Sequence, residues 1–332
     1  MKELWIEFGI VCVVSFVLTA ILTYFIIPIL KGKKVSQHIL EIGPNWHSAK
    51  EGTPTMGGIG FIMAILITLL GISVWFFIEK KHSQLVPLAL TLLLAVLNGM
   101  IGFVDDFCKL MKKQNQGLKA YQKFALQVIV AIVYLFVMKY MGCIDTILHI
   151  PFTDIQVDIG FVYYIFALLT IVGMVNSVNL TDGIDGLAGS ITLIVFVFLA
   201  LVGTIKYRDS SLSLMSGALM GGMLGFLIFN LNPAKVFMGD TGSLFLGGAV
   251  VGATFIIDEP IIVFIIGGIY LLEVISVMLQ VGSYKLFRKR IFKMAPLHHH
   301  LEKSGFTENK ICLCAIFLTF LFSVPAYIIY LP

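Results

Sequence analysis

The chain contains ten apolar runs that are long enough to cross a lipid bilayer. They lie near residues 4–30, 57–78, 86–104, 124–140, 159–178, 187–205, 211–230, 241–257, 260–282 and 311–330. A spanning helix needs about 20 mostly apolar residues, and inside lipid only helices and closed barrels satisfy their backbone hydrogen bonds. The sequence therefore predicts an all-α, polytopic integral membrane protein in which all 332 residues form a single transmembrane domain.

The composition supports this fold class. Hydrophobic residues make up 58% of the chain and charged residues 13%, which leaves too little polar side chain to cover a soluble domain. The runs are apolar on every side, whereas barrel strands alternate apolar and polar residues. The first run is too long for a signal-peptide core and has no small-residue cleavage site, so we expect a retained span. The five cysteines have no metal-binding spacing and are expected to pack without disulfides.

The basic residues predict which loops are cytoplasmic. Ten spans place both termini on one side and divide the loops into two sets. One set, at about 31–56, 105–123, 179–186, 231–240 and 283–310, holds 17 of the 23 Lys and Arg residues. Cytoplasmic loops carry an excess of Lys and Arg, so this set is predicted to lie inside and both termini outside. In the outer set, segment 145–158 alternates with period two and predicts a short hairpin. The glycine pairs at 221–222, 247–248 and 267–268 are expected to permit close helix packing.

The unusual polar residues all belong to the predicted cytoplasmic face. They are Asp105 and Asp106 in DDFCK, Asp182 and Asp185 in TDGIDG, Asp240 in MGDTGS, and His298, His299 and His300 in APLHHHLE. An isolated acidic pair at a span end is an ordinary loop charge, but five aspartates among lysines, glycines and histidines favour a functional site. We expect them at headgroup depth, where they avoid the cost of about 2.5–3.5 kcal/mol for a charge at the bilayer centre.

These residue types indicate phosphate chemistry. Clustered carboxylates bind a divalent cation or raise one another's pKa, and Mg²⁺ prefers one or two carboxylates plus phosphate and water oxygens. Lysines neutralise phosphates, and glycine-rich turns let backbone N–H groups approach an anion. The sequence therefore predicts Mg²⁺-assisted handling of a phosphate or diphosphate at the membrane surface. It has no P-loop, DGIDG lacks the spacing and final Glu of an EF-hand, and Lys109 replaces the third acid of the prenyl-transfer motif that DDFCK resembles.

The ninth apolar run contains two polar residues. Glu273 lies about half-way along it, and Gln280 follows seven residues later on the same helical face. For Glu273 we favour a protonated carboxyl in an interhelical hydrogen bond over a functional role. Gln280 is nearer the predicted cytoplasmic surface and is a candidate for substrate contact.

Five segments resemble the phospho-N-acetylmuramoyl-pentapeptide-transferase family, in the family's order and over essentially the whole chain. They are GTPTMGG (52–58), DDFCK (105–109), NSVNLTDGIDGLA (176–188), FMGDTGS (237–243) and APLHHHLE (295–302). The aspartate motifs are shared with the wider superfamily of polyprenyl-phosphate N-acetylhexosamine-1-phosphate transferases. GF at 305–306 replaces a common Gly-Trp pair, and NKICL lacks a usual arginine, but neither departure removes a polar motif residue.

The resemblance implies an activity, a location and partners. The chain would be a ten-span catalytic domain of peptidoglycan synthesis in the bacterial plasma membrane, with its site on the cytoplasmic face. It would transfer phospho-MurNAc-pentapeptide from UDP-MurNAc-pentapeptide to undecaprenyl phosphate, giving lipid I and UMP with Mg²⁺ as cofactor. The two substrates and the bilayer would be its partners, without nucleic acid, and a homodimer stays open.

The resemblance also implies residue roles. Asp240 would be the first Mg²⁺ ligand, and Asp105 and Asp106 would help to hold the metal or the acceptor phosphate. Asp105 is preferred over Asp106 as the base or, in a rival scheme, as a covalent nucleophile. We favour direct in-line attack, because the acceptor phosphate is already anionic and positioning with charge neutralisation can carry phosphoryl transfer.

The remaining candidates would contact substrate. Lys50, Lys109, Lys113 and Lys123 would neutralise phosphates, and His299 or His300 would bind the diphosphate, with His299 as the catalytic candidate. Asn176, Asn179, Asp182 and Asp185 would line the nucleotide-sugar pocket, and Phe237 would stack on uracil. The other substrate-binding candidates are Asn230, Gln280, His298 and His300.

Two alternatives remain open. One is another superfamily member that uses UDP-GlcNAc, against which APLHHHLE and GTPTMGG together argue. The other is a secondary transporter, which would need polar sites near the midplane on broken helices and often paired repeats. Only Glu273 fits that second model.

Overall fold

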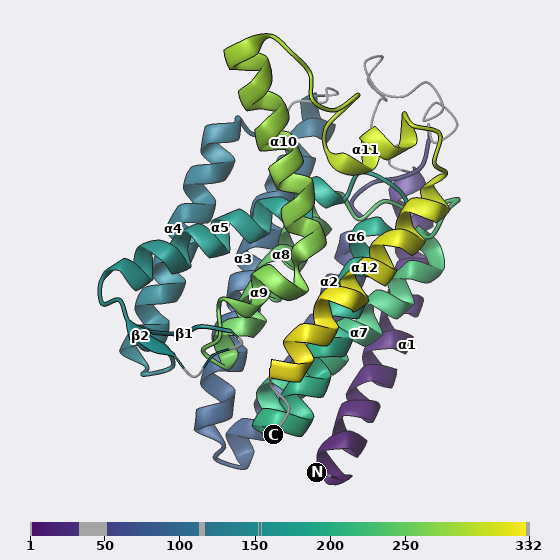
Figure 1. The fold of residues 1–332 in the computed structure, drawn as a ribbon. Helices are drawn as coiled ribbons and strands as arrows, with labels where there is room; N and C mark the ends of the chain where they lie inside the picture. Colours follow the sequence, from purple (N-terminus) through teal and green to yellow (C-terminus); the bar gives the residue numbers. More distant parts are fainter. Residues whose placement is uncertain (1, 33–51, 113–116, 152, 154, 330–332) are drawn as a thin grey trace.

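The computed structural model describes the chain except residues 1, 33–51, 113–116, 152, 154 and 330–332. The helices labelled in Figure 1 are α1 (Lys2–Gly32), α2 (Gly58–Ile78), α3 (His82–Lys112), α4 (Ala120–Tyr140), α5 (Val162–Thr181), α6 (Leu187–Leu201), α7 (Ser210–Asn230), α8 (Gly239–Ile256), α9 (Ile262–Ile266), α10 (Gly268–Phe287), α11 (Leu297–Glu302) and α12 (Glu308–Ile329). A π-helical segment, Val202–Tyr207, continues α6. Within the described residues, ten helices are long and apolar enough to span a membrane, which confirms the all-α polytopic fold.

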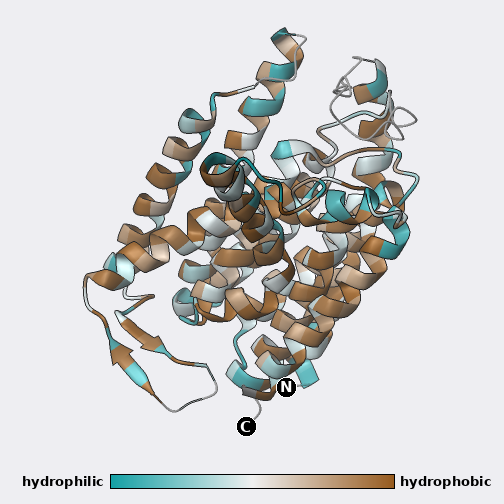
Figure 2. Ribbon diagram, turned by 45° about the horizontal axis from the view of Figure 1, so that its top comes forward, coloured by the Kyte–Doolittle hydropathy of each residue, from teal (hydrophilic) through white to brown (hydrophobic). Residues whose placement is uncertain are grey.

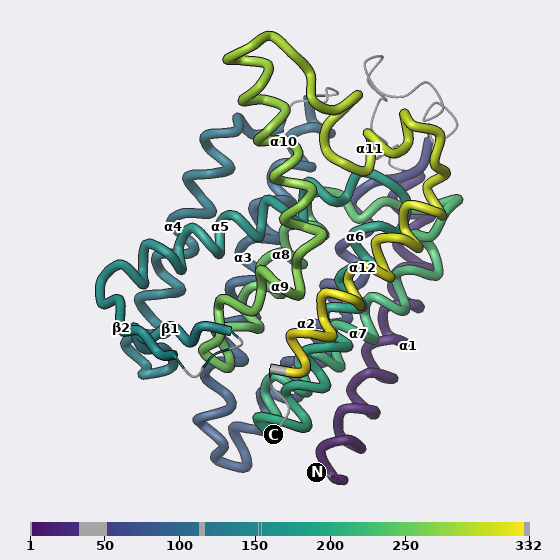
Figure 3. The backbone as a smooth tube through the Cα atoms, viewed as in Figure 1, coloured from purple at the N-terminus to yellow at the C-terminus, as the bar shows by residue number. Residues whose placement is uncertain are grey.

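The predicted hairpin is also present. Strands β1 (Ile147–His149) and β2 (Gln156–Asp158) pair antiparallel, with Leu148 opposite Val157. The backbone trace shows α1 beginning and α12 ending at the same end of the bundle, and α11 lies toward the opposite end (Figure 3). Most of the helix surface is apolar, and hydrophilic residues gather at the helix ends and connections (Figure 2). The assignment of the α11 end to the cytoplasm stays a prediction from the Lys and Arg distribution.

Helix α8 forms the centre of the bundle. Of the residues of α8, 83% are buried, whereas only 17% are buried in the most apolar stretch of α1, which lies at the periphery. Its sequence, GDTGSLFLGGAVVGATFI, is rich in small residues. Lipid tails are as apolar as leucine, so helices in a membrane associate through close van der Waals contact, which small residues permit. The composition of α8 therefore explains its central place.

Helices α3 and α8 approach each other closely through glycine residues. A Cβ added to Gly102 of α3 would overlap the backbone of Asp240 in α8, and one added to Gly248 of α8 would lie 2.9 Å from the Ala95 Cα. The predicted role of the pair 247–248 is thus confirmed, because Gly247 in turn packs against the Val175 backbone of α5. Helix α3 is held so near α8 that their polar ends must meet.

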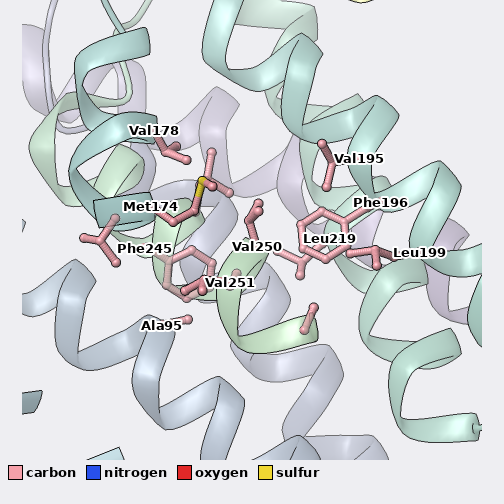
Figure 4. Close-up of a cluster of buried hydrophobic side chains, with 14 of the residues drawn as sticks. Ala95, Met174, Val178, Val195, Phe196, Leu199, Leu219, Phe245, Val250 and Val251 are labelled. Carbon is pink, nitrogen blue, oxygen red and sulfur yellow. The ribbon is translucent and has the colours of Figure 1, made fainter. Parts of the chain in front are cut away.

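Apolar side chains fill the space around α8. Figure 4 shows Phe245, Val250 and Val251 of α8 beside Met174 of α5 and Leu219 of α7. These residues are at most 1% exposed. The same helices that bury these side chains carry the polar motifs at their ends. The five cysteines are all free, as expected.

Two predicted boundaries differ from the structure. The helix of α3 continues to Lys112, so Asp105 and Asp106 lie on a helix and not at the start of a loop. The ninth run, predicted as one span at 260–282, is divided at Gly267 into short α9 and long α10. The run stays long enough for one span across this division, but the glycine pair at 267–268, which was expected only to permit helix packing, stands at the break.

The substitution Gly102→Ala tests the α3–α8 contact. The added Cβ overlaps backbone atoms that cannot rotate away, so we expect a loss of stability of about 1–3 kcal/mol, typical of overpacking. Gly173→Ala in α5 is the matched control, since its Cβ would meet no atom within 4 Å. That variant should be neutral or gain up to about 1 kcal/mol from helix propensity. Thermal midpoints in detergent measure both, and equal behaviour of the two variants would contradict the packing argument.

Candidate active site

Three aspartates from two helices form one acidic cluster. Asp105 and Asp106 lie on α3, and Asp240 lies in the first turn of α8. Each offers a carboxylate oxygen, and these oxygens all lie within 4.8 Å of one another. Asp105 and Asp106 are buried, and Asp240 is partly exposed. Oxygen ligands at this spacing could hold a hard divalent cation such as Mg²⁺.

Two lysines neutralise this cluster. The Lys109 ammonium lies 2.7 Å from Asp105 Oδ2, 3.5 Å from Asp106 Oδ1 and 2.9 Å from Asp240 Oδ2. Lys123 of α4 donates to Asp240 Oδ2 at 3.0 Å and to Asn179 Oδ1 of α5 at 3.1 Å. The structure thus brings four helices together at one point. Two of the predicted phosphate-binding lysines, Lys109 and Lys123, belong to it, while Lys50 and Lys113 lie outside the described residues.

The amide of Asn179 is fixed by the same network. Its Nδ2 donates to Asp240 Oδ1 at 3.0 Å and to Ser243 Oγ at 2.8 Å. Asn176, one turn earlier on α5, instead donates to Gln127 Oε1 of α4 at 2.7 Å and to the Val172 carbonyl. The two asparagines therefore do different work: Asn179 orients an aspartate, and Asn176 ties α5 to α4.

Asp106 accepts hydrogen bonds through one oxygen. Its Oδ2 accepts from the Thr241 backbone N–H at 2.9 Å and from the Thr241 hydroxyl at 2.8 Å. Its Oδ1 is buried and accepts no hydrogen bond from any described residue, although the Lys109 ammonium lies 3.5 Å away. A buried oxygen without a hydrogen-bond donor is costly, and a bound cation would supply a close partner. Gly239, at φ +71°, lets the backbone pass this carboxylate, since a Cβ there would lie 2.6 Å from Asp106 Oδ2.

The glycine-rich segment 52–58 packs directly on the start of α8. The Phe237 N–H donates to the Pro54 carbonyl, and the Phe237 carbonyl accepts from the Gly57 N–H at 2.8 Å. A Cβ on Gly58 would lie 2.5 Å from the Gly242 Cα, so only glycine fits. Phe237 is half-buried beside the acidic cluster's helix, where its backbone anchors segment 52–58.

Asp182 ends α5 near the same cluster. It is half-buried, and its side chain makes no hydrogen bond or ion pair within the described residues. Burial raises the pKa of Asp182 well above its usual range, and the negative charges of Asp240, Asp106 and Asp185 act in the same direction. An aspartate that keeps its proton to higher pH can donate a hydrogen bond to an anionic ligand.

Asp185 and Asn230 hold two loops together. Asp185 Oδ2 accepts from Asn232 Nδ2 and from the Ala234 N–H, both at 3.0 Å. Asn230 Oδ1 accepts from the Gly186 N–H, and its Nδ2 donates to the Val236 carbonyl at 2.9 Å. These contacts join the TDGIDG turn to the connection before α8. Both residues were predicted to contact substrate, and in the structure their polar atoms contact the protein.

The three histidines of α11 point in different directions, because neighbours on a helix are about 100° apart. His298 is buried, with Nδ1 3.1 Å from Glu273 Oε2, and its Nε2 lies where a Cβ on Gly183 would have to be. His299 Nδ1 is 2.6 Å from Glu302 Oε2. A carboxylate at one ring nitrogen fixes the orientation and tautomer of a histidine. An interhelical hydrogen bond of Glu273 is confirmed, since its Oε2 accepts from the His298 backbone N–H at 3.3 Å. The protonation of this carboxyl stays a prediction.

His300 and Gln280 organise the loop before α11. His300 Nδ1 accepts from the Lys293 N–H at 3.1 Å. Gln280 Oε1 accepts from the N–H groups of Ile291 and Phe292 at 3.0 and 2.9 Å, and its Nε2 donates to the Phe292 carbonyl. All the hydrogen bonds of the Gln280 amide in the described residues go to this loop, so it positions the segment that carries the histidines.

Sequence reasoning missed several residues that support the cluster. Thr241 and Ser243 follow Asp240 inside a motif that was singled out for its glycines, and Glu302 ends the histidine motif. Their positions within motifs were a usable signal. Gln127 of α4 and the Leu118 N–H, which donates to Asp105 Oδ1 at 2.8 Å, lie outside every motif and gave none.

The chain is similar in sequence to known transferases. The family model described as glycosyl transferase family 4 matches residues 88–258. A phospho-N-acetylmuramoyl-pentapeptide-transferase of Alkaliphilus metalliredigens is 46% identical over 314 residues, which cover 91% of each chain. The enzyme of that name from Caldicellulosiruptor bescii is 40% identical over 95% of this chain and 94% of its own. That from Clostridioides difficile is 42% identical over 90% of each.

Gln280→Leu tests the anchoring of the loop before α11. Loss of three hydrogen bonds should open this loop locally and speed tryptic cleavage among the exposed residues Arg288, Lys289 and Arg290 by at least about tenfold. The rate is read from site-specific fragments by mass spectrometry. Gln280→Glu is the matched control, because it keeps both acceptor contacts and should be cleaved nearly as slowly as wild type. Wild-type cleavage of the leucine variant would refute the anchoring role.

Proposed function

The chain belongs to the phospho-N-acetylmuramoyl-pentapeptide-transferase family, and we propose that its acidic cluster is the site at which lipid I is formed. The enzyme transfers phospho-MurNAc-pentapeptide from UDP-MurNAc-pentapeptide to a polyprenyl phosphate, undecaprenyl phosphate, and releases UMP. It is a multi-pass protein of the bacterial plasma membrane. The observation that carries the proposal is the convergence of Asp105, Asp106 and Asp240 with two lysines at one end of the bundle. A homodimer stays a prediction of the family resemblance.

The cluster fits Mg²⁺ as cofactor. Asp240, Asp105 and Asp106 supply hard oxygen ligands within 4.8 Å of one another, and Asp106 Oδ1 is a buried oxygen that lacks a hydrogen-bond donor among the described residues. Bound Mg²⁺ would neutralise charge on the diphosphate of the donor and help to position its phosphorus. Thr241 and Asn179 would keep two of the carboxylates oriented toward that position.

Lys109 and Lys123 supply mobile positive charge. Each ammonium contacts Asp240 Oδ2, at 2.9 and 3.0 Å, and each side chain is partly exposed. An ammonium group has three donors on a flexible stem, so it can exchange a carboxylate partner for a phosphate oxygen. We assign these lysines to the phosphates of donor and acceptor, where they would stabilise the charge that spreads over the transferred group.

Direct attack by the lipid phosphate accounts for the chemistry. An oxygen of the acceptor phosphate forms a bond to the phosphorus that carries the sugar, and the bond from that phosphorus to the oxygen of UMP breaks. Asp105 would instead help to hold the metal, and its carboxylate is oriented by the Leu118 N–H at Oδ1 and by Lys109 at Oδ2, at 2.8 and 2.7 Å.

Asp240→Asn should reduce turnover by more than about 100-fold, since it removes one charge from the carboxylate that both lysines and Asn179 contact. The remaining activity should need a higher Mg²⁺ concentration. UMP release from UDP-MurNAc-pentapeptide with undecaprenyl phosphate, measured across a Mg²⁺ titration, gives both quantities. Asp158→Asn in the exposed hairpin is the matched control. Wild-type turnover and Mg²⁺ dependence in the Asp240 variant would exclude its assignment as a metal ligand.

The one-step route predicts that no enzyme-bound phosphosugar accumulates. Incubation with donor labelled in the MurNAc-pentapeptide and with Mg²⁺, but without lipid phosphate, should leave the protein unlabelled after denaturation. Addition of the acceptor should then produce labelled lipid I. A labelled adduct at Asp105 that is consumed when acceptor is added would establish the two-step route instead.

A further inference from the structure

A cavity lies between the C-terminal half of α10 and the segment around α11, and none of the three aspartates of the acidic cluster lines it. Its volume is about 400 Å³. Val277, Val281 and Met294 form apolar walls, and Gln280 and Tyr284 add polar groups. The hydrogen bonds of Gln280 to Phe292 and Ile291 join α10 to the connection on the other side of this cavity.

Four cations line the cavity, and no carboxylate of the residues that the structure describes does. They are Lys285 on α10, Arg290 and Lys293 in the connection, and Lys303 after α11. Lys293 Nζ donates to the Lys303 carbonyl at 3.2 Å. Within the described part of the chain none of the four forms an ion pair. Like charges around one cavity repel one another, and an anion bound among them removes that repulsion.

The chain next to the cavity-lining residues carries exposed apolar side chains. Leu286 is 77% exposed and Phe287 69% exposed, and both flank the basic residues at the end of α10. Ile291 beyond them is also exposed. Exposed apolar side chains interleaved with Lys and Arg are typical of segments that lie at the headgroup boundary of a membrane. Figure 1 shows this end of α10 at the end of the bundle opposite the termini.

We propose that this cavity binds the anionic headgroup of a diacyl glycerophospholipid. The phosphate would lie among Lys285, Arg290 and Lys303, and the acyl chains would leave along the apolar residues of α10 that line the same cavity, Val277 and Val281. Clusters of Lys and Arg next to a spanning helix attract acidic lipid, whose headgroups supply the missing negative charge.

The bound lipid would connect α10 to the histidine segment. Lys285 belongs to α10, while Lys303 directly follows α11, so one phosphate between them bridges the two. The segment joined in this way also receives the Gln280 and His300 hydrogen bonds. Occupancy of the cavity would therefore stabilise the position of α11, whose His298 packs against Gly183 of the TDGIDG turn. This site is independent of the transfer reaction and binds without nucleotide.

Lipid retention in detergent tests the proposal. Native mass spectrometry would compare phosphatidylglycerol with phosphatidylcholine of the same acyl chains. Wild type should retain the anionic lipid at least about tenfold better, and the triple variant Lys285→Gln, Arg290→Gln, Lys303→Gln should lose that preference. The control triple variant Lys235→Gln, Lys289→Gln, Lys310→Gln removes the same charge from exposed positions that do not line the cavity, and it should keep the preference.

Equal loss in both triple variants would overturn the proposal in favour of general charge attraction. Displacement of phosphatidylglycerol by millimolar inorganic phosphate, or by UDP-MurNAc-pentapeptide, would also overturn it, because the cavity would then be a site for free phosphate or for the donor. Thermal midpoints in phosphatidylcholine check folding. If the triple variant is unstable, Arg290→Gln alone should lose part of the preference, and full retention would refute the site. These experiments measure lipid binding and stability without substrate turnover, so their outcome is independent of whether the proposed transfer activity is correct.

Discussion

Charge compensation among three aspartates is the constraint on which the site depends. Two unit charges 4 Å apart repel by about 4 kcal/mol at the effective dielectric near a protein surface, and Asp105, Asp106 and Asp240 lie that close together. Lys109 contacts all three, and Lys123 contacts Asp240. These lysines come from α3 and α4, so the cluster is stable only when several helices are assembled. The fold and the chemistry therefore share one requirement, which is positive charge held at the ends of α3 and α8.

The packing of the spans meets that requirement through backbone contact. Gly102 places α3 directly against the Asp240 backbone, and Gly58 brings the segment 52–58 onto Gly242. Side chains at these positions would separate the motifs that the site needs together. The α11 segment then covers the neighbouring TDGIDG turn, with His298 against Gly183. Small residues here fix the distance between functional groups as well as the association of helices.

The sequence predicted the spans, the hairpin and the gathering of the polar motifs, because apolar length and residue type determine these features. It did not distinguish residues of one type within a motif. The negative charges of Asp240 and Asp106 help to raise the pKa of Asp182. Asp185 instead accepts hydrogen bonds from Asn232 and Ala234. Asn179 orients Asp240, whereas Asn176 binds Gln127 of a different helix. Such partners depend on tertiary distance, which composition and spacing leave undetermined. The continuation of α3 through Lys112 was missed for a related reason, since polar residues end an apolar run without ending a helix.

The break between α9 and α10 shows how one feature supports different functions. A discontinuous helix and a buried glutamate are features of secondary transporters, where they bind substrate near the midplane. Here Gly267 divides the run. A Cβ added to the next residue, Gly268, would lie 2.7 Å from the Phe322 ring of α12, so the glycine lets α10 pack closely on α12. Glu273 uses its carboxylate to bind His298 of α11. This buried carboxyl thus holds α11, whose His298 packs against Gly183 of the TDGIDG turn. The residue that suggested transport therefore accounts for the position of the histidine segment.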